Sequence, residues 1–162
     1  MPLIEYTAGQ AREIEAQPWT FVEEGQEIPE RGNVVVSPKR AQTLDIQREG
    51  RIGLLFSPDE EAEAHADLVR RAPFIAVTFP KFTDGRGYST ASVLRGRLGY
   101  EGPLRATGDV LPDQVFYMAR VGFDQLELRS DKSAQTAIDA LSAFSVRYQA
   151  STDGPPLFRQ RR

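Results

Sequence analysis

From Asn33 onward the chain repeats one pattern five times: a short run of apolar and β-branched residues, a turn, and a longer stretch with apolar residues at helical spacing. The five apolar runs are NVVV (33–36), RIGLLF (51–56), FIAVTF (74–79), LRAT (104–107) and QLEL (125–128). Strands that alternate with helices of this length pair in parallel through right-handed crossovers. We therefore expect residues 33–150 to form a single α/β domain of about five βα units with a mainly parallel sheet.

The order of the strands in that sheet is open to two interpretations. Five βα units form either an open doubly wound sheet or an incomplete α/β barrel. We favour the open doubly wound sheet, because a complete eight-fold barrel takes ~250 residues and this chain has 162.

The two ends of the chain do not follow the repeat. Trp19, Phe21 and Val22 alternate like one face of a short strand, so we expect residues 1–32 to form an N-terminal arm or hairpin that covers a sheet edge. The last twelve residues, STDGPPLFRQRR (151–162), contain few apolar side chains and three arginines. We expect a flexible basic tail.

Composition excludes several classes of chemistry. The chain has no cysteine and one histidine, so it has no thiolate nucleophile, no cysteine-ligated cluster and no multi-histidine metal site, and we predict no metal. A net charge of −3 argues against nucleic-acid binding. No apolar run approaches the ~20 residues of a membrane span, and the first residues do not resemble a signal peptide. We expect a cytoplasmic protein that does not contact a membrane.

The loop after the third apolar run is the first candidate site. Lys81, Arg86 and Ser89 lie between an expected buried strand and a helix start, where free backbone N–H groups favour an anion. Gly85 and Gly87 let the backbone approach such a ligand closely. We expect an oxyanion such as sulfite, sulfate or phosphate; the alternative is that the polar residues only cap turns and pair with one another.

The loop after the fourth apolar run is the second candidate. It contains Gly108 and Asp109, with Arg105 upstream as a further anion-binding candidate. Neighbouring parallel strands bring their following loops together, so we expect Asp84, Arg86 and Asp109 to meet. Asp84 and Asp109 are then the candidate catalytic acid–base residues, while capping of the following helix is the structural alternative for Asp109. The segment GRGYST lacks the third glycine of the dinucleotide fingerprint, so no cofactor is assigned.

Four segments at near-fixed spacing identify a family. They are FPKFTDGRGYS (79–89), LRGRLGY (94–100), LRATGDVLPDQ (104–114) and VGFDQLEL (121–128). Together they strongly resemble the bacterial family known as domain of unknown function 934. The resemblance implies a role in sulfur assimilation, because genes of that family commonly lie beside those for assimilatory sulfite reductase, and its members are labelled as oxidoreductases of sulfite reduction. It supplies no catalytic residues.

Two functional hypotheses follow. The first is an accessory protein of bacterial sulfite or sulfate reduction, which binds sulfite reductase or a small oxyanion at the strand-end loops. The alternative is a lyase, isomerase or hydrolase of a small anionic substrate, with Asp84 or Asp109 as the acid–base residue and Arg86 or Lys81 holding the anion.

Overall fold

The computed structural model describes residues 1–44 and 49–143, in which eight strands form one sheet. The order across the sheet is β2-β1-β8-β7-β6-β5-β4-β3. The strands are β1 (Leu3–Thr7), β2 (Gln10–Ile14), β3 (Trp19–Phe21), β4 (Asn33–Val36), β5 (Ile52–Phe56), β6 (Ile75–Phe79), β7 (Leu104–Gly108) and β8 (Gln125–Glu127).

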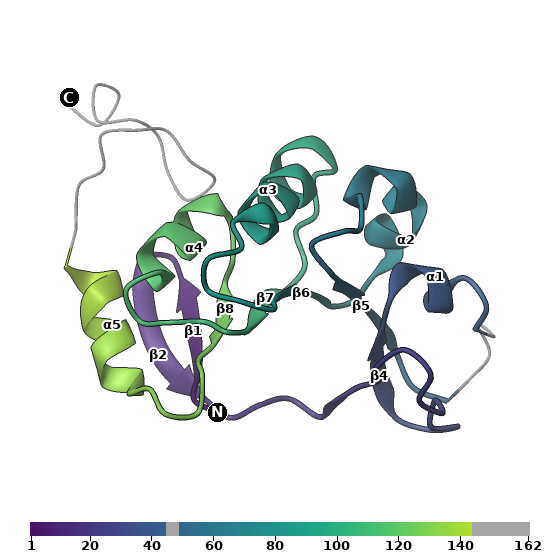
Figure 1. Ribbon diagram of the computed structural model, residues 1–162, viewed down its shortest axis with the longest axis horizontal. Helices are drawn as coiled ribbons and strands as arrows, with labels where there is room; N and C mark the ends of the chain where they lie inside the picture. The colour runs from purple at the N-terminus through teal and green to yellow at the C-terminus, as the bar shows by residue number, and fades with distance from the viewer. Residues whose placement is uncertain (45–48, 144–162) are drawn as a thin grey trace.

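The helices follow the strands from β4 onward. They are α1 (Pro38–Ala41), the 3₁₀ turn η1 (Ala62–His65), α2 (Ala66–Arg71), α3 (Arg86–Ser92), the π-helical turn η2 (Val93–Arg97), α4 (Val115–Val121) and α5 (Ala134–Ser142). α1 to α4 lie along one side of the sheet (Figure 1). α5 packs against α4, β1 and β2.

The sheet is mixed and curves into a half-barrel (Figure 1). β3 to β8 are parallel neighbours in chain order, whereas β1 is antiparallel to both β8 and β2. The expected mainly parallel, doubly wound sheet is therefore wrong. A doubly wound sheet reverses its strand order once, which puts helices on both faces. Here each crossover reaches the next neighbour in the same direction, so the helices stay on one face.

The N-terminal 32 residues supply both edges of the sheet. The β1–β2 hairpin lies beside β8, and β3 lies beside β4 at the opposite edge. The antiparallel pairs of the sheet are therefore formed by a hairpin that precedes the βα repeat in the chain. The basic tail expected at residues 151–162 lies outside the described residues.

Alternate residues of β4, β5 and β6 face two separate cores. Val34 and Val36 belong to the large core beneath the helices, whereas Val35 joins a second core with Phe74 and Ala76. That second core is packed by Trp19 and other residues of β3 and β5, and by no helix residue. Both faces of the strands are thus buried, which explains why their sequences read as continuous apolar runs.

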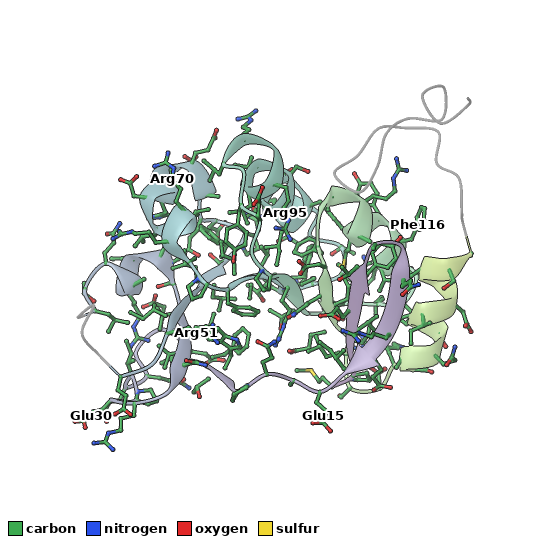
Figure 2. All side chains as sticks on the ribbon, turned by 180° about the vertical axis from the view of Figure 1, so that it is seen from behind. Glu15, Glu30, Arg51, Arg70, Arg95 and Phe116 are labelled. Atoms are coloured by element: carbon green, nitrogen blue, oxygen red, sulfur yellow. The ribbon has the colours of Figure 1, made fainter. Side chains whose placement is uncertain are left out.

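A row of four side chains crosses the inner, helix-free face of the half-barrel. The Arg51 guanidinium, labelled in Figure 2, lies 5.5 Å from the centre of the Trp19 ring. Trp19 stacks on Phe74 with 4.9 Å between ring centres and 19° between planes. The Arg105 guanidinium lies over the Phe74 ring, 4.9 Å from its centre. Cation–π and stacking contacts therefore connect the edge strand β3 to the middle of the sheet.

The hairpin turn between β1 and β2 gives the first prediction. Its central residues, Ala8 and Gly9, have φ of 52° and 81°, and a turn with two positive φ angles favours Asn-Gly. Ala8 is exposed, so Ala8→Asn should raise the free energy of unfolding by about 0.5–1 kcal/mol, measured by urea denaturation. The matched change Ala64→Asn, in the exposed 3₁₀ turn, should give no gain. Equal effects of the two substitutions would contradict the explanation.

Candidate functional site

The loops that follow β6, β7 and β8 meet at one end of the sheet, which we call the strand-end edge (residues 80–85, 109–114 and 128–133). Backbone hydrogen bonds connect neighbouring loops: Asp109 N donates to Phe79 O at 2.7 Å, and Arg129 N donates to Val110 O at 3.2 Å. The sequential strand order places these loops side by side, because β6, β7 and β8 are neighbours in the sheet.

Arg86 at the start of α3 is held by two carboxylates. Its Nε and Nη2 donate to Asp84 Oδ1 and Oδ2 at 3.0 and 2.7 Å, and its Nη1 donates to Asp59. Its backbone N–H also donates to Asp84 Oδ1, at 3.2 Å. The hydrogen bonds from Arg86 lower the pKa of the Asp84 carboxyl. The carboxylate of Asp84 thus occupies the position at the first turn of α3 where an oxyanion would bind.

Asp109 belongs to a second charged cluster. Its Oδ1 accepts from Arg129 Nη1 at 3.0 Å, and its Oδ2 accepts from the backbone N–H of Phe82 at 2.9 Å. Arg129 also donates to both carboxylate oxygens of Asp131, at 2.7 and 2.9 Å, and Lys132 pairs with Asp131 at 3.2 Å. The hydrogen bond from Arg129 lowers the pKa of Asp131. Asp109 therefore connects the β6 loop to the β8 loop.

The expected meeting of Asp84, Arg86 and Asp109 does not occur as direct contact. Within the described part of the chain, no hydrogen bond or ion pair joins Asp109 to either of the other two. Lys81 is exposed, and its ammonium group has no described partner. Ser89 is exposed and lines a groove between α3 and α4. The predicted anion-binding residues are thus distributed over several surfaces.

Arg105, the fourth predicted anion-binding residue, lies on the inner face of the half-barrel and is 2% exposed. Its Nε and Nη2 donate to Gln125 Oε1 at 3.1 and 2.9 Å, and its Nη1 lies 3.4 Å from Glu127 Oε2. Thr107 Oγ1 donates to Glu127 Oε1 at 3.1 Å. Sequence reasoning missed this cluster. The available signal was the alternation of Gln125 and Glu127 with Leu126, which is typical of a strand with one polar face.

The loop-shaping glycines are required mainly by packing. A Cβ on Gly87 would lie 2.6 Å from the Phe79 ring, and a Cβ on Gly108 would lie 2.5 Å from the Phe79 carbonyl oxygen. Gly108 also has φ of 97°, a conformation that L residues rarely adopt. Gly85 has an ordinary negative φ and precedes α3. Two of the three glycines therefore let the loops pack around Phe79.

Phe82 is the residue of this edge that sequence reasoning did not assign to the site. Its side chain is 50% exposed, although both of its backbone polar atoms are bound. Its N–H donates to Asp109, and its carbonyl accepts from Gln114 Nε2 at 2.8 Å. The ring lines a cavity of about 500 Å³. The other lining residues are Leu111, Pro112, Asp113, Arg129, Lys132 and Thr136.

A larger cavity, of about 800 Å³, opens at the opposite end of the sheet beside Arg95, which is labelled in Figure 2. Arg95 donates to the carbonyl oxygens of Tyr100, Gly102 and Gly122 at 2.7, 2.8 and 2.9 Å, and to Asp124 Oδ2 at 3.0 Å. These bonds tie the π-helical turn to the start of β8. The hydrogen bonds of Arg95 therefore stabilise the fold, and we assign this residue no functional role.

Two carboxyls near the strand-end edge, Asp84 and Asp131, are poorly suited to donate a proton. Arginine hydrogen bonds lower the pKa values of Asp84 and Asp131, and a carboxyl with a lowered pKa is a poor proton donor near neutral pH.

In the described ranges no group of three or more His, Asp or Glu side chains is arranged to hold a metal ion. Nor does any helix there have the length and apolar character needed to span a membrane.

Comparison with protein families gives a match over most of the chain. The model of a family described as bacterial protein of unknown function (DUF934) matches residues 53–158, which include the loops of the strand-end edge. Neither the curated proteins nor the solved structures contain a match to this chain.

The buried cluster on the inner face gives the second prediction. Glu127→Gln removes the negative charge beside Arg105, whose side chain is 2% exposed. Because a buried charge then lacks its partner, the free energy of unfolding should fall by roughly 3 kcal/mol, measured by urea denaturation. Adding Arg105→Met to Glu127→Gln should restore most of the loss. A double variant no more stable than Glu127→Gln alone would show that the charge is not the cause.

Proposed function

This chain belongs to the bacterial DUF934 family, and from that premise we propose that it is an accessory protein of assimilatory sulfite reduction, which docks onto sulfite reductase through the strand-end edge. The pathway is supported by the gene neighbourhood of the family that the sequence resembles. The docking surface is supported by the residues of the edge itself.

The observation that carries the docking proposal is the exposed ring of Phe82 on a fixed backbone. Exposed large apolar side chains are few among the described residues, and Phe82 is one of three, with Met1 and Tyr117. Aromatic residues next to a concave surface are frequent anchors of protein interfaces. The cavity beside Phe82 provides such a surface, with Leu111 and Pro112 as apolar walls.

The charges of the edge favour a protein partner over a free oxyanion. Arg86 is shared between Asp59 and Asp84, and Arg129 is shared between Asp109 and Asp131. An inorganic anion would have to displace carboxylates that already use these donors. A protein partner can cover Phe82 while leaving the ion pairs at the rim, where charges tune association more than affinity.

Docking through Phe82 gives the third prediction. Phe82→Ala should weaken binding to sulfite reductase by about 30-fold, the effect of removing an aromatic anchor worth ~2 kcal/mol. Binding is measured by co-purification of the two proteins and by titration calorimetry. Because the ring is half exposed, the melting temperature of the variant should stay close to that of the wild type.

Two controls make the result specific. Phe82→Tyr keeps an aromatic ring at the same position and should retain binding. Gln135→Ala alters α5, outside the strand-end edge, and should have no effect. Wild-type affinity in a well-folded Phe82→Ala variant, or failure of the wild type to bind sulfite reductase, would refute the proposal.

A further inference from the structure

We infer that Asp109 and Gln114 are positioning residues that hold Phe82 in its docking conformation, and that Gln114 does so at a cost in fold stability. The inference rests on the docking role proposed for Phe82. It goes beyond that role by assigning two residues that hold Phe82 through its backbone atoms and do not need to touch the partner.

Asp109 fixes the amide side of Phe82. Its Oδ2 accepts the Phe82 N–H at 2.9 Å, while its Oδ1 is held by Arg129 Nη1 at 3.0 Å. The backbone of Asp109 is also anchored, because its N–H donates to the Phe79 carbonyl at 2.7 Å. A loop amide is therefore tied to the neighbouring β7 loop and, through Arg129, to the β8 loop. Such a charge-assisted hydrogen bond is stronger than a neutral one.

Gln114 fixes the carbonyl side of Phe82. Its Nε2 donates to Phe82 O at 2.8 Å, and Gln114 directly precedes α4. Its Oε1, however, is buried and has no hydrogen-bond partner among the residues that the structure describes. A buried acceptor without a donor destabilises a fold. The side chain thus keeps one bond to Phe82 while its other polar atom is left unpaired.

An exposed anchor residue binds a partner best when its backbone is already ordered. A loop residue with a free ring ordinarily samples several backbone conformations, and ordering it on binding weakens the complex. Here one side chain from each end of the β7 loop binds one backbone atom of Phe82. The following turn is closed by Asp84 N, which donates to Lys81 O at 2.9 Å. The anchor is therefore ordered before the partner arrives.

A residue that serves function can destabilise the fold locally. Gln114→Met has a similar volume, removes the donor to Phe82 and also removes the unpaired acceptor. A purely structural Gln114 would make this variant less stable. A positioning Gln114 makes it at least as stable as the wild type but weaker in docking. Stability and affinity therefore move in different directions, which separates the two roles.

The fourth prediction compares Gln114→Met and Asp109→Ala in the full chain. Gln114→Met should leave the urea midpoint unchanged or raised and should weaken binding to sulfite reductase ~5-fold, from lost preorganisation. Asp109→Ala should accelerate hydrogen exchange of the Phe82 amide ~10-fold in the free protein, because that amide loses its acceptor. Gln135→Met and Asp139→Ala are the matched controls, since these residues bond each other on the exposed side of α5. They should change neither affinity nor Phe82 exchange.

Both variants are also made on the Phe82→Ala background, where neither should weaken binding further. Equal losses with and without the ring would overturn the inference, because the residues would then act independently of the anchor. Unchanged Phe82 exchange in Asp109→Ala, or a lowered urea midpoint in Gln114→Met, would overturn it as well. If Phe82→Ala itself binds like the wild type, the docking role fails, and the exchange and stability data still decide whether Phe82 is held.

Discussion

The stacked row of Arg51, Trp19, Phe74 and Arg105 is the interaction on which the half-barrel depends. A sheet with helices on only one face must bury its other face in some other way. Here that face is filled by its own side chains and by the N-terminal strand β3, which carries Trp19. The row ends at Arg105, whose burial requires Glu127 and Gln125 as partners. The inner face therefore has an apolar half and a polar half, joined by this row.

The strand-end edge is a direct product of the same strand order. Because β6, β7 and β8 are consecutive neighbours, Asp109 in the middle loop reaches Phe82 on one side and Arg129 on the other. A doubly wound order would separate some of these loops. The charged residues of the edge thus fix the positions of the loops around the half-exposed ring of Phe82.

The sequence predicted local structure better than arrangement. The strand at residues 33–36 is confirmed, and the apolar run 74–79 differs from β6 by one residue. After the apolar run 51–56, a single turn closes where Glu60 N donates to Ser57 O at 3.2 Å, and the expected helical stretch begins only at Ala62. Strand order was not predictable, since βα periodicity does not record the direction of each crossover. Of the candidate site, the loops were identified but the partners were not: Asp109 binds Arg129, 20 residues away, a distance that no local motif reveals.

The N-terminal hairpin has a consequence for how the chain is made. Ile4 of β1 pairs with Leu126 of β8, so β1 has no sheet neighbour except β2 until β8 has been synthesised. Contacts between residues so distant in sequence slow folding. During synthesis, which proceeds from the N-terminus, the apolar face of the hairpin stays uncovered until β8 is available. β1 and β8 therefore pair late, after the strands that lie between them in the chain have been synthesised.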